Sequence, residues 1–208
     1  MSSLSYKIIA AVSFVFFVVL GYFVSIGEET ITSLNLKVFE TLIYSDIAQH
    51  QTFWRTVTAL GGPYFLGFLT ILTTLYFWIK KDYRDTKIYL VGMFGGALLV
   101  GVLKYITASE RPHFISAIER TFSFPSGHTA LSVIFLIISS YIYTKNMHHK
   151  HKLLIYVSCA IISIMIALSR LYLGEHWLTD IFGGYLLAFA YSFFCIDILR
   201  RRRAQCIA

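Results

Sequence analysis

The sequence predicts an all-α integral membrane protein: a bundle of six transmembrane helices, with short amphipathic interfacial helices between the first and second spans. Hydrophobic residues make up 57% of the 208 residues and charged residues only 14%, whereas soluble domains carry about 25% charged residues. The apolar residues form six stretches, and the basic residues are distributed unevenly over the breaks between them. This composition argues against a soluble, disordered or nucleic-acid-binding protein.

Each apolar stretch is expected to be the centre of one transmembrane helix. The first exceeds the apolar core of a signal peptide, which is about 7–15 residues, and no A-x-A-like cleavage site follows, so we expect it to be retained. Several of the others are shorter than the roughly 20 residues that cross a bilayer, so their polar ends must be helical too. The six stretches are residues 8–26, 64–79, 88–103, 129–143, 153–168 and 181–199.

Residues 28–60 are too polar to span a membrane and are predicted to form an interfacial helical cap. Leu34, Val38 and Leu42 recur every four residues, which is the pattern of one amphipathic helix. Two interpretations of this cap stay open: a surface element packed on the bundle, or a lid beside a lipid entrance. The positions that indicate a second helix are Ile47, Trp54, Val57 and Leu60.

The charges of the loops predict the orientation of the chain. With six spans, the two termini share one side of the membrane. That side carries twelve basic and three acidic residues, and the other side carries six basic and eight acidic residues. The positive-inside rule places both termini in the cytoplasm. The formal net charge of +7 therefore indicates orientation in a membrane. With no repeat and only short loops, we expect residues 1–208 to form a single domain.

Polar residues gather at the outer ends of four predicted helices. Ionisable residues at such positions are costly and often functional. Because these helix ends lie on one face of the bundle, we expect them to converge. The three groups are residues 104–112, 125–128 and 169–180.

The types of residue in these groups are suited to binding a phosphate. Lys104, Arg111 and Arg170 supply three cations, and the planar fork of arginine matches two phosphate oxygens at once. Ser126 precedes an apolar run and is predicted to cap the N-terminus of a helix. The backbone amides that follow form an anion site, and Gly127 lets a ligand approach the backbone closely.

Two histidines supply the remaining parts of a phosphoryl-transfer site. His176 and Asp180 are four residues apart, so they share one face of a helix, and a neighbouring carboxylate fixes the tautomer of an imidazole. With His128 near the same anion site, one histidine can attack phosphorus while the other protonates the leaving oxygen. Each residue taken singly has a structural interpretation, as an interfacial anchor, a polar cap or a structural hydrogen bond. The combination on one face favours catalysis.

The three groups resemble the signature of the type-2 phosphatidic acid phosphatase family, which reads K-x6-RP, then PSGH, then SR-x5-H-x3-D. All eleven specified positions agree, in order. Within that pattern the resemblance implies that His176 is the nucleophile, that Asp180 orients it, and that His128 is the general acid. The residues that it assigns to the phosphoryl oxygens are Lys104, Arg111, Ser126, Gly127 and Arg170.

The resemblance also implies a reaction and a location. Members of the family act without a metal or another cofactor on lipid phosphates in the bilayer, and we expect undecaprenyl diphosphate or phosphatidylglycerophosphate as substrate at the outer face of the plasma membrane. A phosphatidic acid phosphatase, a lipid phosphotransferase on the same scaffold and a lipid transporter are the alternatives. Besides the lipid substrate and the bilayer, we expect no nucleic-acid partner. Outside the signature, Glu110 and Glu175 are expected to be solvated charges.

Overall fold

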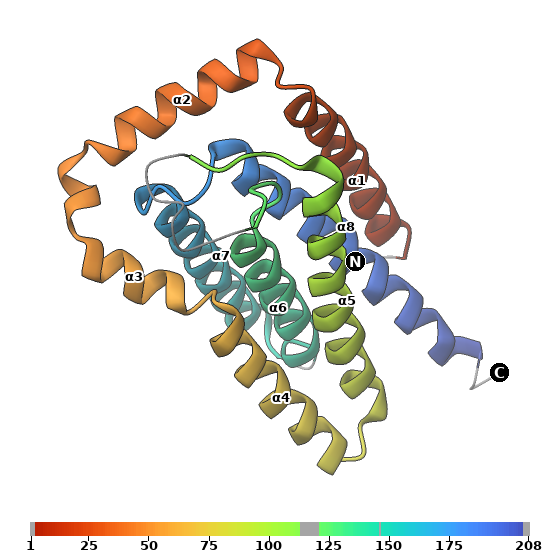
Figure 1. The fold of residues 1–208 in the computed structure, drawn as a ribbon. Coiled ribbons are helices and arrows are strands. Elements are labelled where there is room, and N and C mark those ends of the chain that lie inside the picture. The colour runs from red at the N-terminus through yellow and green to blue at the C-terminus, as the bar shows by residue number, and fades with distance from the viewer. Residues whose placement is uncertain (1–2, 113–120, 146, 206–208) are drawn as a thin grey trace.

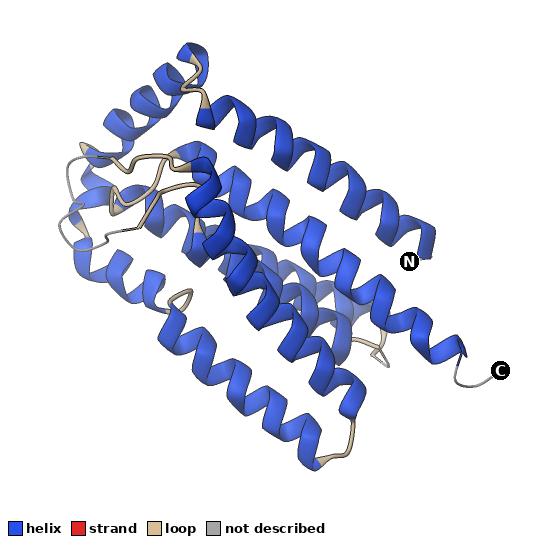
Figure 2. Cartoon of the chain, turned by 45° about the vertical axis from the view of Figure 1, so that its right-hand side comes forward, coloured by secondary structure: helices blue, strands red, loops and turns tan. Residues whose placement is uncertain are grey.

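The computed structural model describes residues 3–112, 121–145 and 147–205, with side chains as far as residue 198. Within these ranges all regular secondary structure is helical (Figures 1 and 2). The elements are α1 (Ser3–Ser25), α2 (Glu29–Ile43), the 3-10 helix η1 (Asp46–Gln49), α3 (Gln51–Ala59), α4 (Pro63–Ile79), α5 (Tyr83–Thr107), α6 (Gly127–Tyr143), α7 (His149–Tyr172) and α8 (Leu178–Gln205).

All six predicted apolar stretches are helical, five of them in helices long enough to cross a bilayer, and the chain is a multi-pass membrane protein. The helices α1, α5, α7 and α8 are each long and apolar enough to cross a bilayer, and so is the segment Gln51–Ile79, which joins α3 to α4. The prediction that polar ends extend the apolar stretches is confirmed for α5 and α7, which reach 25 and 24 residues. Helix α6 stays shorter, at 17 residues.

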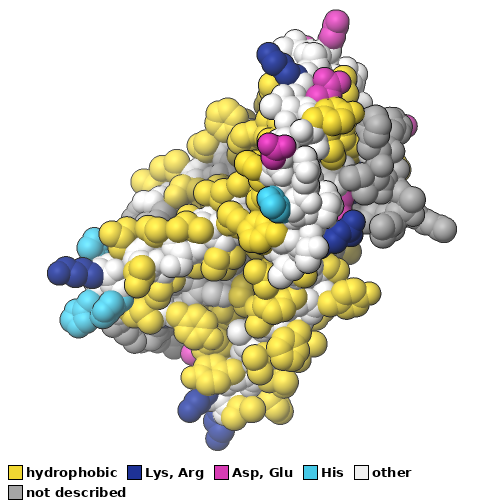
Figure 3. All heavy atoms as spheres, turned by 90° about the vertical axis from the view of Figure 1, so that its left-hand side faces the viewer, with side chains coloured by type: hydrophobic (Ala, Val, Ile, Leu, Met, Phe, Trp, Pro, Cys, Tyr) yellow, Lys and Arg dark blue, Asp and Glu magenta, His cyan; other side chains and the backbone are white. Residues whose placement is uncertain are grey.

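On the face shown in Figure 3, apolar side chains form a broad band, and most of the charged side chains lie toward the two ends of the bundle. Large exposed hydrophobic residues are found on α1, α4, α5 and α7. In water this surface would be unfavourable, whereas in a bilayer it contacts lipid tails of similar polarity. The distribution is that of helices surrounded by lipid.

Helix α8 is central to the packing, because it contacts α1, α2, α5 and α6. Close approach at one glycine places the loop before α6 against it. A Cβ atom on Gly183 would overlap the ring of Phe124, which is fully buried and stacks on Phe17 of α1 at 5.6 Å between ring centroids. Phe124 thereby anchors the loop that leads into α6 between α1 and α8.

Helices α2 and α3 form the predicted cap, and Figure 1 shows them passing across one end of the bundle. The side chain of Asn35, on α2, donates a hydrogen bond to the hydroxyl of Thr179 at 2.9 Å and accepts one from its amide at 3.2 Å. Trp54, on α3, stacks on Tyr172 of α7 at 4.5 Å. Both helices are therefore packed on the bundle, which favours the surface-cap interpretation.

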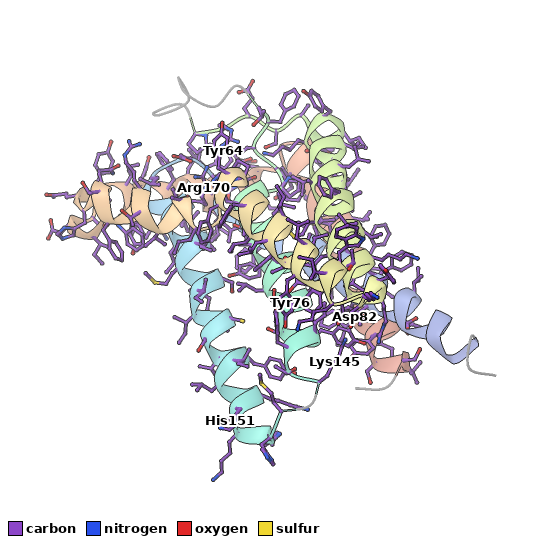
Figure 4. All side chains as sticks on the ribbon, turned by 90° about the horizontal axis from the view of Figure 1, so that it is seen from below. Tyr64, Tyr76, Asp82, Lys145, His151 and Arg170 are labelled. Atoms are coloured by element: carbon purple, nitrogen blue, oxygen red, sulfur yellow. The ribbon has the colours of Figure 1, made fainter. Side chains whose placement is uncertain are left out.

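The opposite end of the bundle holds both ends of the described chain. The hydroxyl of Ser3 donates a hydrogen bond to the carboxylate of Asp197 at 2.6 Å. Near the same end, the ammonium group of Lys145 contacts both carboxylate oxygens of the buried Asp85, at 2.9 and 2.8 Å. Figure 4 shows Lys145 and His151 at this end, and Arg170 at the other end of α7.

Candidate active site

The three polar groups of the signature meet at the end of the bundle that α2 and α3 cross. The backbone amide of Ser126 donates a hydrogen bond to the carbonyl of Asp180 at 3.0 Å, which joins the second group to the third. The guanidinium of Arg111 donates one to the carbonyl of Glu175 at 2.7 Å, which joins the first group to the third. The predicted convergence of the helix ends is therefore confirmed.

His176 and Asp180 form a buried pair. The Nδ1 atom of His176 lies 3.0 Å from Oδ2 of Asp180, and the amide of Trp177 donates to the same oxygen at 2.8 Å. The side chain of His176 is 1% exposed and that of Asp180 is fully buried. The predicted pairing is found, although His176 lies in the turn before α8 and not on a helix, so the turn at Trp177 provides the geometry.

Ser123 contacts both residues of the His176–Asp180 pair, and its role was not predicted from the sequence. Its hydroxyl is fully buried, donates a short hydrogen bond to Oδ2 of Asp180, and lies 3.3 Å from Nδ1 of His176. No spacing rule distinguishes Ser123 from the other serines of the chain. Its position between the two catalytic candidates depends on how Phe124 seats the loop against α8.

Arg111 lies beside the other nitrogen of the imidazole. Its Nη1 atom is 3.4 Å from Nε2 of His176. The rest of the guanidinium is held by Thr121, whose carbonyl accepts from Nε at 2.7 Å and whose hydroxyl accepts from Nη2 at 3.2 Å. These contacts orient the fork of Arg111 toward the space next to Nε2. An anion bound to Arg111 would therefore lie within reach of that nitrogen.

Lys104 is half-buried at the C-terminal end of α5. Its ammonium group donates to the carbonyls of Phe122 and Ser123, the latter at 3.2 Å. The lysine is thus tied to the loop that carries Ser123. These contacts hold the charge of Lys104 close to the His176–Asp180 pair.

Arg170 is almost completely buried, with 2% of its surface exposed. Its Nη1 atom donates to the hydroxyl of Thr58, on α3, at 2.9 Å. Its Nη2 atom forms an ion pair with the carboxylate of Glu175. The expectation that Glu175 is a solvated charge is therefore wrong: the turn after α7 brings its carboxylate back onto Arg170. Glu110 is exposed, as expected.

Ser126 caps α6 as predicted. Its hydroxyl accepts from the amide of Thr129 at 3.5 Å and from the hydroxyl of Thr129 at 3.1 Å. Gly127 and His128 follow in the first turn, where amides have no carbonyl partner within the helix. The Nε2 atom of His128 lies 3.7 Å from where a Cβ atom on Gly62 would be. His128 therefore faces the glycine turn between α3 and α4.

The surroundings of His176 keep its imidazole neutral. Its pKa is held well below the ordinary value of 6.5, first by burial and then by the positive charges of Arg170, Arg111, Lys104 and His128. Since Nδ1 faces Asp180, the proton of the neutral ring resides on Nδ1 and the lone pair on Nε2. The site therefore presents an unprotonated ring nitrogen beside Arg111.

Known proteins were compared with the chain. The family model of the PAP2 superfamily matches residues 85–204. The phosphatidylglycerophosphatase B of Bacillus subtilis is 34% identical over 136 residues, and the match covers 63% of this chain and 66% of that protein, just under two thirds of its length. An undecaprenyl-diphosphatase of Sulfolobus acidocaldarius is 27% identical over 191 residues, with 88% of this chain and 87% of that protein covered.

Two solved structures are similar in fold. The crystal structure of a transmembrane PAP2-type phosphatidylglycerolphosphate phosphatase from Bacillus subtilis superimposes with a TM-score of 0.82 and 26% identity, over 94% of this chain and 97% of that one. LpxE of Aquifex aeolicus has a TM-score of 0.59 at 22% identity, over 79% of this chain and 95% of that one, and supports the fold alone. Because the family model covers more than half of its length, the chain belongs to the PAP2 superfamily.

Proposed function

We propose that the chain is a metal-independent phosphatase of lipid phosphates or diphosphates that acts through a phosphohistidine on His176. Membership of the superfamily and the phosphatase names of both relatives support hydrolysis of a lipid phosphate. The proposed mechanism rests on the buried His176–Asp180 pair, in which Nδ1 of His176 faces Asp180 and Nε2 lies beside Arg111. We further propose that residues 1–208 act as one domain.

In the first step, Nε2 of His176 attacks the terminal phosphorus, and the bond from phosphorus to the leaving oxygen breaks. His128 donates its proton to that oxygen. Asp180 accepts a hydrogen bond from Nδ1 and stabilises the positive charge that develops on the ring. The products of this step are a phosphohistidine and the lipid without its terminal phosphoryl group, which is an alcohol from a lipid monophosphate and a lipid monophosphate from a diphosphate.

In the second step, water attacks the phosphohistidine. His128, which is now neutral, takes a proton from this water, and the bond from phosphorus to Nε2 breaks. The electron pair of that bond returns to His176, so the imidazole regains its starting form, and inorganic phosphate is released. Both steps are in-line displacements at phosphorus.

The positively charged side chains serve to stabilise the transferring group. Lys104, Arg111 and Arg170 offset the charge that spreads over the equatorial oxygens. The amides of Gly127 and His128, at the start of α6, contribute the positive end of a helix dipole, and Ser126 holds this end in place. The cations are preorganised in the structure by Thr58, Thr121 and the loop carbonyls.

For the substrate, we propose undecaprenyl diphosphate or phosphatidylglycerophosphate. The names of the two relatives support these lipids, and six spans place the chain where the tail of either lipid lies. The excess of basic residues in the loops on the side of the termini supports an active site at the outer face of the plasma membrane. A cysteine placed among residues 200–203 should react with a membrane-impermeant reagent only after permeabilisation, and labelling of intact cells would contradict this orientation.

The test of the function is phosphate release from a panel of lipid phosphates and diphosphates in EDTA. The variant His176→Ala should lose activity by at least about a thousandfold, since it removes the nucleophile. His151→Ala is the matched control, because it makes the same change at the opposite end of α7 (Figure 4). Retained turnover in His176→Ala would show that His176 is not the nucleophile. A new phosphate ester formed with an added alcohol would show a phosphotransferase instead.

A further inference from the structure

Helix α7 ends in a turn that places an acidic side chain on a cation of the candidate active site. Gly174 has a left-handed backbone conformation, with φ of +67°. Its amide donates to the carbonyl of Leu171 at 2.9 Å, and the amide of Glu175 donates to the carbonyl of Arg170 at 3.0 Å. These two bonds define a Schellman motif, which brings the side chain of the last residue, Glu175, next to that of Arg170.

In most Schellman motifs these two positions make a hydrophobic contact. Here the contact is an ion pair between Nη2 of Arg170 and the carboxylate of Glu175. Its two sides differ in exposure: 2% of the surface of the Arg170 side chain is accessible, compared with 22% for Glu175. The guanidinium is therefore fixed in the protein, whereas the side chain of Glu175 is partly exposed, although the carboxylate oxygen that contacts Arg170 is buried.

Two anions can therefore bind Arg170: the carboxylate of Glu175 and the phosphoryl group of the substrate. Our mechanism requires its guanidinium to contact a phosphoryl oxygen, but Thr58 takes Nη1 and Glu175 takes Nη2. A carboxylate oxygen and a phosphoryl oxygen seek the same in-plane donors of an arginine. Although a guanidinium has five N–H donors, a phosphoryl group on the Nη2 side of Arg170 would bring its negative charge against the carboxylate of Glu175, so the two anions compete for Arg170.

We propose that Glu175 is a built-in competitor that a phosphoryl group displaces from Arg170, and that it thereby sets the affinity of the active site for phosphate. The inference rests on the proposed function, because it takes Arg170 as a phosphate-binding residue. In the free enzyme, Glu175 compensates the buried charge of Arg170, which would otherwise be costly. In the complex, the phosphoryl group takes over that role and the carboxylate turns to solvent.

The consequence is a lower affinity for every phosphate anion, since part of the binding free energy is spent on breaking the ion pair. The same competition helps the product to leave, because Glu175 returns to Arg170 when inorganic phosphate dissociates. The phosphate groups of neighbouring lipids, which are far more abundant than any substrate, face the same competitor. Glu175 thereby sets how tightly the site holds phosphate anions in general.

The test compares the wild-type protein with Glu175→Gln, which keeps the size of the side chain and removes its charge. We would measure the rise in Tm as inorganic phosphate is added, since a ligand that binds only the folded state stabilises it by RT ln(1 + [L]/Kd). The dissociation constant of phosphate is obtained from this rise, and its inhibition constant is measured in the lipid assay. Both the dissociation constant of phosphate and its inhibition constant should fall by about tenfold in the variant, the change typical of one charge-assisted contact.

Glu110→Gln is the matched control, because it removes one negative charge from an exposed residue of a neighbouring loop. Its dissociation constant for phosphate should stay within about twofold of that of the wild type. Glu175→Ala provides a second variant that lacks the carboxylate, should the glutamine variant fold poorly.

Three outcomes separate the two claims. A wild-type protein whose Tm does not respond to phosphate would contradict the proposed phosphate site itself. A wild type that responds, with variants at position 175 that need as much phosphate or more, would overturn the competitor and show that Glu175 only positions Arg170. An equal gain in Glu110→Gln would attribute the effect to general charge and would also overturn it.

Discussion

Replacing Ser123 with alanine tests how the catalytic pair is held. The hydroxyl is fully buried, donates to Oδ2 of Asp180, and lies 3.3 Å from Nδ1 of His176. Lys104 contacts the backbone carbonyl of Ser123, which the substitution retains. We therefore expect Ser123→Ala to lower kcat and to leave KM within about twofold of the wild type.

The size of the effect follows from what remains after the substitution. A hydrogen bond to a charged group contributes about 1.5–3 kcal/mol. Asp180 would keep the amide of Trp177, at 2.8 Å, and Nδ1 of His176, at 3.0 Å, so its carboxylate would not be left without donors. We take the lower part of the range, about 1.5–2 kcal/mol, which corresponds to a decrease in kcat of about 10- to 30-fold.

The assay is initial-rate phosphate release over a range of lipid concentrations, with Ser192→Ala as control. Ser192 is also a fully buried serine of this protein, and its hydroxyl has no hydrogen-bond partner within the described part of the chain. Its replacement should leave kcat unchanged. A kcat within twofold of the wild type in Ser123→Ala, or a loss carried by KM, would refute the positioning role of this hydroxyl.

Three further predictions concern pH and stability. The folded-state pKa of His176 lies well below 6.5, so its stabilising contribution is present above pH 6.5 and is lost as the pH falls below 6.5. The Tm of the wild type should therefore drop relative to that of His176→Ala below pH 6.5. A constant difference between the two Tm values would contradict a neutral His176 in the folded state. Asn35→Leu leaves the buried amide and hydroxyl of Thr179 without the side-chain amide of Asn35, so it should lower the free energy of unfolding by about 2 kcal/mol and lower kcat. Full stability of this variant would show that Asn35 does not hold α2 on α8. Lys145→Met, which leaves the buried carboxylate of Asp85 without its cation, should lower the free energy of unfolding by about 3 kcal/mol and leave kcat per folded molecule unchanged. Asp85→Asn in the same background should recover part of this stability. A loss of activity in the folded enzyme would contradict a purely structural role of the ion pair.

The spans and the convergence of the signature could be predicted because they depend on local patterns. Apolar stretches identify helices whatever surrounds them, and Ser126 before an apolar run indicates a cap from sequence alone. The convergence of the signature groups followed from placing four helix ends on one face. Each of these inferences uses spacing along the chain, and the structure confirms them.

The contacts that complete the site could not be predicted, because they depend on packing between distant segments. Ser123 reaches Asp180 only because Phe124 is seated between α1 and α8. Asn35 reaches the start of α8 across 144 positions of sequence. Glu175 was misjudged for a local reason: the Schellman turn at Gly174 reverses the chain and returns the carboxylate to α7. A glycine followed by a charged residue at a helix end is the signal that could have indicated this contact.

The stereochemistry at phosphorus distinguishes transfer through a phosphohistidine from direct attack by water. A lipid thiophosphate made chiral with oxygen isotopes would be hydrolysed in isotopically labelled water, and the configuration of the released thiophosphate would be determined. Transfer through a phosphohistidine on His176 involves two in-line displacements, each of which inverts phosphorus, so the account predicts overall retention of configuration. Overall inversion would show direct attack by water and would rule out a phosphohistidine on His176.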